Sequence, residues 1–191
     1  SRGNLSFTSI NLPRLAIESR GDEELFHKKL DDMLELTAKQ LLDRFEIQAS
    51  KRVYNFPFLM GQGVWLDSDK LGPRDEVREV LKHGTLSIGF IGLAATLTAL
   101  YGHHHGESGE MQEKGLAIVR HMRKFCDKEA QKTHMNFGLL ATPAEGLSGR
   151  FVRMDQKRYG KIPCVTDREY YTNSFHIPVW YHISAYDKIQ K

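Results

Sequence analysis

The sequence predicts an α/β fold built on a parallel sheet. Two stretches, FIGLAAT and LLATPAEG, each pass directly from an apolar strand pattern into a helical pattern. Strands separated by helices usually run parallel, so their carboxyl ends open on one side of the sheet, where ligands bind in open sheets and barrels alike. The chain has 191 residues, 40% of them hydrophobic, and shows no repeat or linker, so we expect 1–191 to be one domain segment without an internal boundary.

The first third of the chain predicts a strand followed by a long helix. Residues 5–12, LSFTSINL, are rich in β-branched and aromatic side chains and end against Pro13. From Glu23 to about Ala49, apolar residues recur at three- and four-residue spacing, and acidic residues gather at the N-terminal end, where they favour the helix dipole. Residues 53–66 are apolar without a period and contain Pro and Gly, which indicates packed irregular structure.

The remainder predicts alternating helices and strands. Proline at the start and glycine at the end mark one short helix, and an apolar run after it suits a strand that is buried on both faces. The predicted elements are a helix from Pro73 to Gly84, a strand over 85–92, a helix ending near Gly102, a helix over about 108–133, a strand over 136–141 and a helix from Pro143 to about Asp155.

The overall charge excludes few kinds of partner. The formal net charge is +3, which does not by itself imply a nucleic-acid or membrane partner, although one phosphate pocket needs few cations. The sequence contains neither an apolar run near 20 residues nor a signal-peptide pattern after Ser1. We therefore expect a cytoplasmic protein with no membrane and no nucleic-acid partner.

Cysteine and histidine give weak signals. Cys126 and Cys164 are too few for a disulfide framework and lack C-x-x-C spacing, and Cys126 lies in a helical pattern as a small buried side chain. The HHHGE stretch at 103–107 is the obvious metal candidate, but zinc needs three or four ligands and a second shell. Flanking glycines and a following helix cap favour a solvated interhelical loop, so we expect no metal.

The stretch LLATPAEGLSGRF supports two interpretations. In the first, Thr142 is an N-cap, Pro143 takes the first helical position and Glu145 completes a capping box. In the second, Ala144 and Gly146 leave the backbone uncovered, so that free N–H groups and a positive dipole end face an anion. The local pattern leaves both open.

The stretch VTDREYYTNSFHIPVWYHI is dense in hydrogen-bonding residues between aromatic ones. Asn173, Ser174 and His176 could line a pocket, because uncharged amide and hydroxyl groups can recognise a sugar's hydroxyls. The alternative is a turn at 172–174 that leads into a strand, which Pro178 would confine to a sheet edge. No Ser-His-Asp order, P-loop or G-x-G-x-x-G motif indicates a hydrolase or a dinucleotide enzyme.

Four blocks taken together resemble the anaerobic, class III ribonucleoside-triphosphate reductases. They are TSINLPRLAIES, TLSIGFIGLAATLTALYGHHHGE, LLATPAEGLSGRF and VTDREYYTNSFHIPV, and they follow the family's order over nearly the whole chain. The resemblance implies a segment of the ten-stranded α/β barrel that ribonucleotide reductases share with glycyl radical enzymes. In that family a thiyl radical abstracts the ribose 3′ hydrogen and the 2′ hydroxyl leaves as water.

The resemblance also implies partners and cofactors. They are a ribonucleoside triphosphate with magnesium, formate or a thiol as reductant, a stored glycyl radical, an iron–sulfur, S-adenosylmethionine-dependent activase, and a homodimer at full length. The family's thiyl Cys precedes the INLPR block, and its glycyl radical lies in a Gly-Tyr motif that is absent from these 191 residues. We therefore assign no catalytic residue, neither Cys126 nor Cys164, and expect the isolated chain to be inactive.

The substrate-binding residues follow from the same resemblance. The TPAEGLS turn matches the family's substrate-phosphate loop, and Asn11 ends the first strand, where its amide could contact the ribose. We expect Glu145 to turn back and cap the Thr142 N–H, so that capping box and anion site coexist. The predicted set is Thr142, Ala144, Glu145, Gly146, Leu147, Ser148, Asn11, Asn173, Ser174 and His176.

Two positions depart from the family pattern, and two other functions stay open. Ala95 stands where a Glu is expected in GLAE, and Cys164 stands where a Gly is usual before VTDRE, so the local backbone there is expected to differ. The alternatives are a glycyl-radical acyltransferase or lyase, which uses the same barrel for small acids, and an inert fragment that only binds a partner.

Overall fold

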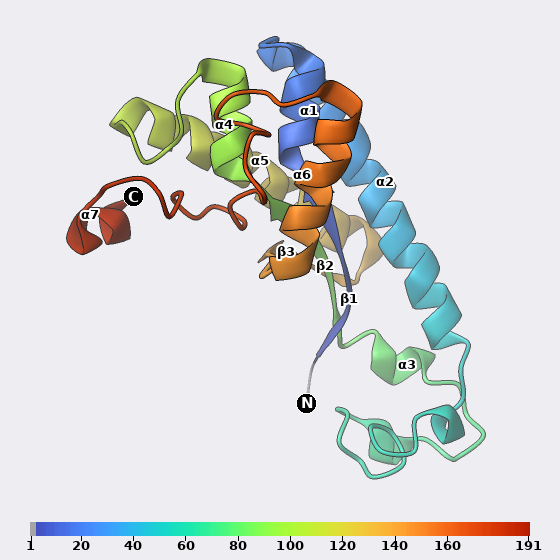
Figure 1. Ribbon diagram of the computed structural model, residues 1–191. Helices are drawn as coiled ribbons and strands as arrows, with labels where there is room; N and C mark the ends of the chain where they lie inside the picture. The colour runs from blue at the N-terminus through green and yellow to red at the C-terminus, as the bar shows by residue number, and fades with distance from the viewer. Residues whose placement is uncertain (1–2) are drawn as a thin grey trace. The chain divides into compact units, whose positions relative to one another are not determined.

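The computed structural model describes residues 3–191 and has an α/β fold with a three-stranded sheet of order β1-β2-β3 (Figure 1). The strands are β1 (Asn4–Asn11), β2 (Thr85–Ile91) and β3 (Asn136–Ala141). The Thr85 N–H donates to the Gly3 carbonyl at 2.9 Å, and a Cβ built on Gly89 would lie 2.7 Å from the Ser9 Oγ. The beginnings of β1 and β2 therefore lie together, as do their ends, so the predicted parallel arrangement is confirmed.

The chain forms two compact units, and β1, α2, β2, α5 and β3 each pass from one unit into the other. The expectation of one domain segment without an internal boundary stays a prediction. The first unit comprises Ser1–Thr8, Glu35–Ile88 and Arg123–Leu139, and the second comprises Ser9–Leu34, Gly89–Met122 and Leu140–Lys191.

The helices confirm most of the predicted pattern. The predicted long helix, the one after the second strand and the one over 108–133 are all present. Among residues 3–191, no helix combines the length and the apolar character that a membrane crossing requires. The helices are α1 (Leu12–Ser19), α2 (Glu23–Ala49), α3 (Arg78–Leu81), α4 (Leu93–Tyr101), α5 (Gly109–Thr133), α6 (Glu145–Tyr159) and α7 (Ala185–Gln190).

Helix α1 is an element that the sequence pattern did not predict. The sequence predicts that a strand ends at Pro13, but Pro13 lies in the first turn of α1, where its missing N–H leaves no donor unpaired. The Asn11 side chain accepts a hydrogen bond from the Arg14 N–H and caps this helix. The helix ends at Arg20, whose φ of 51° places it in the left-handed region.

In the first unit, the predicted helix over 73–84 is mostly wrong. Only α3 is helical, because the backbone before it forms hydrogen bonds with the segment that follows α2. The Val53 N–H donates to the Asp75 carbonyl and the Val77 N–H to the Lys51 carbonyl, both at 3.0 Å. These bonds fix an extended pairing that competes with a helical turn. The neighbouring 53–66 segment is irregular, as predicted, with one 3-10 helix over Val53–Asn55 followed by turns, but most of its residues are exposed rather than packed.

The core of the second unit forms where β2 meets its neighbours. Every residue of β2 after Thr85 is buried, as predicted for a strand covered on both faces. Ile91 belongs to a buried cluster with Val152 of α6 and with Tyr171. Helix α1 packs on α4, and the 160–184 segment runs without a helix or strand from α6 to α7 (Figure 1). The alternative of an edge strand within 165–183 is therefore wrong.

The two cysteines differ in environment. Cys126 is fully buried in α5, as predicted, and burial raises the pKa of its thiol to about 11, so the thiol stays protonated at neutral pH. Cys164 is exposed and has φ 61°, the left-handed region that glycine favours. The backbone at Cys164 thus suits a glycine, although a side chain with a Cβ occupies it.

Replacing Cys164 with glycine should relieve this strain. We expect Cys164→Gly to raise the free energy of unfolding by roughly 0.5–1 kcal/mol, because the left-handed penalty exceeds the added chain entropy of glycine. Urea denaturation of the full-length protein measures it. Cys164→Ala is the control, since it removes the thiol and keeps the Cβ. Equal stability of the two variants would contradict a backbone origin.

Candidate functional site

The turn between β3 and α6 does not form the predicted capping box. The N-cap of α6 is Ala144 rather than Thr142, and no side chain caps the helix. Thr142 is buried, its hydroxyl pairs with the Ser9 hydroxyl at 2.9 Å, and its carbonyl accepts the Ser174 hydroxyl at 3.0 Å. These bonds hold Thr142 outside the helix, so Glu145 occupies the first helical position and its carboxylate does not fold back.

The start of α6 is open. Its first helical hydrogen bond runs from the Ser148 N–H to the Ala144 carbonyl at 2.9 Å, so the amides of residues 145–147 precede the helical ladder. Glu145 and Gly146 are exposed, and a Cβ built on Gly146 would meet nothing within 4 Å. These amides and the positive end of the helix dipole therefore face open space.

A cavity of about 410 Å³ lies beside this helix start. It brings together four residues of the predicted set, Glu145 and Ser148 from α6 and Asn173 and His176 from the following segment. Lys188 of α7 also lines it and supplies a cation that no sequence motif indicated. The remaining lining residues are Tyr170, Thr172, Ile177 and Val179.

The segment that carries Asn173 is fixed over the start of α4. The Gly92 N–H donates to the Thr172 carbonyl at 3.0 Å, and the Leu93 N–H donates to the Ser174 carbonyl at 2.9 Å. The two strand-to-helix joins thus differ, because amides at the start of α4 are covered by carbonyl groups whereas those of α6 are open. The start of α6 is therefore the more open of the two.

The other predicted residues do not line this cavity. Ala144 and Leu147 pack in the core cluster of the second unit. Ser174 is 2% exposed, and its hydroxyl donates a hydrogen bond to the Thr142 carbonyl. The Asn11 side-chain amide donates a hydrogen bond to the Asp155 carboxylate at 2.8 Å. Thr142, Ser174 and Asn11 therefore position the site rather than reach into the cavity.

A buried carboxylate ties the site together. Asp155 of α6 is fully buried, and its Oδ1 accepts bonds from the Arg14 Nε at 2.7 Å and Nη2 at 2.6 Å. Its Oδ2 accepts from the Asn11 amide and the Tyr171 hydroxyl, both at 2.8 Å. Burial, followed by the nearby Asp155 charge, raises the pKa of Tyr171 far above its usual value, so the hydroxyl stays protonated and donates.

The HHHGE stretch is not a fully solvated loop. Its His105 is bonded to the Phe175 carbonyl, and we call this contact the latch. His103 is exposed and pairs with Glu107 at 2.7 Å, as a solvated residue would. The prediction is wrong for His104 and His105, which are buried. The His105 Nε2 lies 2.7 Å from the Phe175 carbonyl, so this nitrogen carries the proton and donates. Among residues 3–191, no group of three or more His, Cys, Asp or Glu is placed to hold a metal ion.

The latch requires a neutral imidazole. The His105 Nδ1 is sealed from solvent and has no hydrogen-bond partner, so a proton there would be buried unpaired. Desolvation lowers the pKa of His105 to about 4. The hydrogen bond to the Phe175 carbonyl opposes this shift, and the charges of His104, His176 and Lys191 add smaller lowering effects. The ring therefore stays neutral at physiological pH and holds the 172–176 segment in place.

Comparison with known proteins first places the fold. Solved structures of the anaerobic ribonucleotide reductase from Thermotoga maritima match 99–100% of this chain with a TM-score of 0.75 at 20% identity, over 29–30% of their own length. One of them has glycerol in its active site and another has dATP in its specificity site. At this identity the likeness shows the fold, a segment of the reductase α/β barrel.

The sequence comparisons then show the family. A family model described as anaerobic ribonucleoside-triphosphate reductase matches residues 1–191. Over 98% of this chain, the reductases of Escherichia coli and Haemophilus influenzae are 40% and 37% identical, and over all of it that of Enterobacteria phage T4 is 30% identical. The chain belongs to the anaerobic ribonucleoside-triphosphate reductase family. It spans 26–30% of the length of these relatives.

Removing the buried carboxylate should destabilise the protein strongly. We expect Asp155→Ala to lower the free energy of unfolding by about 3–5 kcal/mol, because it leaves the Arg14 cation and two further donors without an acceptor. Chemical denaturation measures the loss. Asp127→Ala removes an exposed partner of Arg123 and should cost less than about 1 kcal/mol. Similar losses for the two variants would contradict a special role for Asp155.

His105 should make stability depend on pH. Its folded pKa lies below the unfolded value, so the unfolded chain binds more protons between about pH 4 and 6.5, and stability falls as pH falls through that window. His105→Gln keeps an N–H donor for Phe175 without titrating, so it should flatten this dependence by roughly 1–3 kcal/mol. Thermal unfolding between pH 4 and 8 measures it, with His103→Gln as control. An unchanged profile in His105→Gln would contradict the latch.

Proposed function

We propose that this chain supplies the substrate-binding surface of an enzyme that reduces ribonucleoside triphosphates to 2′-deoxyribonucleoside triphosphates under anaerobic conditions. One observation carries the proposal. The start of α6, with the open amides of residues 145–147, borders through Glu145 and Ser148 a cavity that is also lined by the Lys188 cation and the Asn173 and His176 side chains. Backbone donors and a cation suit phosphate groups, and polar side chains suit ribose hydroxyls.

Different residues of the site bind the phosphates and the sugar. The start of α6 and Lys188 hold the phosphates, and Asn173 and His176 orient the sugar. Glu145 lies among these groups with a free carboxylate, which would repel a triphosphate unless a cation lies between them. Magnesium prefers oxygen ligands, so Glu145 and the phosphates together would hold it and it would neutralise the charge between them.

The radical chemistry is assigned to residues outside this sequence. By the family resemblance, a thiyl Cys and a glycyl radical generated by an iron–sulfur, S-adenosylmethionine-dependent activase perform it, with formate or a thiol as reductant. We include the activase and a homodimer as partners of the full-length protein. In this chain, Ser9, Gly89 and Thr142 fix the phosphate turn, because a side chain at Gly89 would lie 2.1 Å from the Thr142 hydroxyl.

The proposal is tested by removing a single backbone donor. Proline is tolerated in the first turn of a helix, so Gly146→Pro deletes one open amide, while Gly146→Ala keeps that amide and adds a methyl group in open space. In the activated full-length enzyme, we expect Gly146→Pro to raise the KM for the triphosphate about tenfold with little change in kcat, because ground-state binding is lost. Gly146→Ala should leave both constants nearly unchanged.

Two outcomes would contradict the proposal. Equal KM values for Gly146→Pro and Gly146→Ala would show that these amides do not bind phosphate. If calorimetry showed that the triphosphate binds no tighter than pyruvate, the glycyl-radical lyase alternative would gain support. An inert fragment predicts no binding of either compound.

A further inference from the structure

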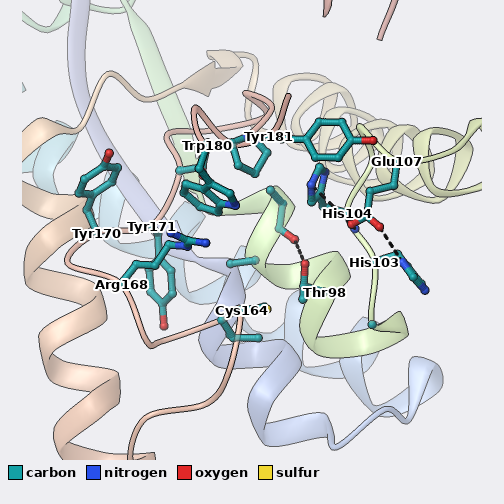
Figure 2. A pocket seen from close by; sticks show the side chains of 16 residues that line it. Thr98, His103, His104, Glu107, Cys164, Arg168, Tyr170, Tyr171, Trp180 and Tyr181 are labelled. Atoms are coloured by element: carbon teal, nitrogen blue, oxygen red, sulfur yellow. Dashed lines mark hydrogen bonds and ion pairs between the residues drawn. The ribbon is translucent and has the colours of Figure 1, made fainter. Parts of the chain in front are cut away.

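A second cavity, of about 370 Å³, is lined by α4 and by the 164–181 segment, which also carries residues of the proposed substrate site (Figure 2). None of the ten predicted substrate-binding residues lines it. One wall is α4, which presents Ala94, Ala95 and Thr98, and the other is the 164–181 segment with its aromatic rings. The methyl groups of α4 face large rings, and this mismatch in size leaves the space open.

The walls are held in place without a ligand. Tyr171 is 1% exposed, and its hydroxyl is fixed by Asp155 at 2.8 Å. The ring of Tyr181 packs edge-on against His104 with 4.7 Å between centroids, and the Tyr181 N–H closes a turn onto the Pro178 carbonyl at 3.0 Å. A preformed cavity binds without an ordering cost at its walls.

The cavity contains one uncommitted cation. The Arg168 guanidinium stacks on the Trp180 ring with its Cζ 3.7 Å from the centroid, and within residues 3–191 it makes no ion pair with a carboxylate (Figure 2). Stacking uses the face of a guanidinium and leaves the donors at its edge free. The one carboxylate that lines the cavity, Glu107, already accepts from the His104 N–H at 2.8 Å and pairs with His103 at 2.7 Å.

We infer that this cavity binds a small organic oxyanion with an apolar or aromatic body. Arg168 takes the oxyanion through two parallel N–H bonds, which match the geometry of a carboxylate or a phosphate. Ala94, Ala95 and the surrounding rings take the apolar body. The volume lies within the usual range for small-molecule sites, and the balance of an apolar lining with one charged group is typical of them.

The test compares ligands that differ only in charge. In the full-length protein, titration calorimetry with benzoate and phenyl phosphate should show binding at least about tenfold tighter than benzyl alcohol, since a hydrogen bond to a charged group contributes more than a neutral one. The two anions decide which oxyanion Arg168 prefers. Equal affinity for the anions and the alcohol would overturn the inference, as would no binding because another part of the protein fills the cavity.

The role of Arg168 is tested by variants at this exposed position. Arg168→Leu retains apolar contact with Trp180 and removes the charge, so benzoate affinity should fall about tenfold or more. Arg168→Lys keeps the charge and loses the fork, and should recover part of the loss. Arg74→Gln removes an exposed arginine elsewhere and should have no effect. The same affinity in Arg168→Leu as in the unaltered protein would overturn the inference.

This inference is independent of the proposed function. The KM for the triphosphate should not change in Arg168→Leu, because Arg168 does not line the cavity at the start of α6. Loss of benzoate binding together with an unchanged KM would place the anion in the second cavity. A parallel loss of both would assign Arg168 to the substrate site and overturn the inference.

Discussion

The proposed substrate site depends on one buried carboxylate. Asp155 accepts from three side chains that belong to different parts of the second unit: Asn11 at the end of β1, Arg14 in α1 and Tyr171 in the irregular C-terminal segment. A charge without contact with water is tolerated only when paired and hydrogen-bonded, and here all four bonds converge on its two oxygens. The geometry of α6, and with it the direction of its open amides, follows from this constraint.

The two strand-to-helix joins differ because the 172–174 segment forms different hydrogen bonds at each of them. At α4, the carbonyls of Thr172 and Ser174 accept the amides of Gly92 and Leu93. The same segment then reaches Thr142 through the Ser174 hydroxyl and holds that residue out of α6. The same segment thus occupies two amides at the first helix start and keeps Thr142 out of the second, whose amides stay open to a ligand.

Local pattern was sufficient for elements that are marked by a strong apolar pattern and by glycine at their ends. The long helix from Glu23, the buried strand β2 and the helix after it follow from apolar periodicity and glycine caps, and the structure confirms them. The pattern failed where distant residues supply the partners. The helix expected from Pro73 yields to pairing with 51–53, and the capping box at Thr142 yields to Ser9, 133 residues away in sequence.

The site shows the same limit. Four members of the predicted set line one cavity. The sequence does not distinguish Asn11 and Ser174 from these four, but in the structure both side chains are engaged in internal hydrogen bonds. Lys188 had no local signal, because a lone lysine in a short helix is indistinguishable from a solvated one. The role of His105 was not predictable, because three consecutive histidines suggest a metal site. Its hydrogen bond to the Phe175 carbonyl depends on a residue 70 positions away and is known only from the structure.

The two cavities share a wall, and the way this wall is fixed bears on whether their ligands can influence one another. Tyr170 and Thr172 line both cavities, and Tyr171 between them points to Asp155. Coupling between sites needs an element with two arrangements that the ligands favour unequally. This wall is held on one side by the buried carboxylate and on the other by the amides at the start of α4, so we expect it to keep one arrangement. Binding in the two cavities should therefore be nearly additive, as for independent sites.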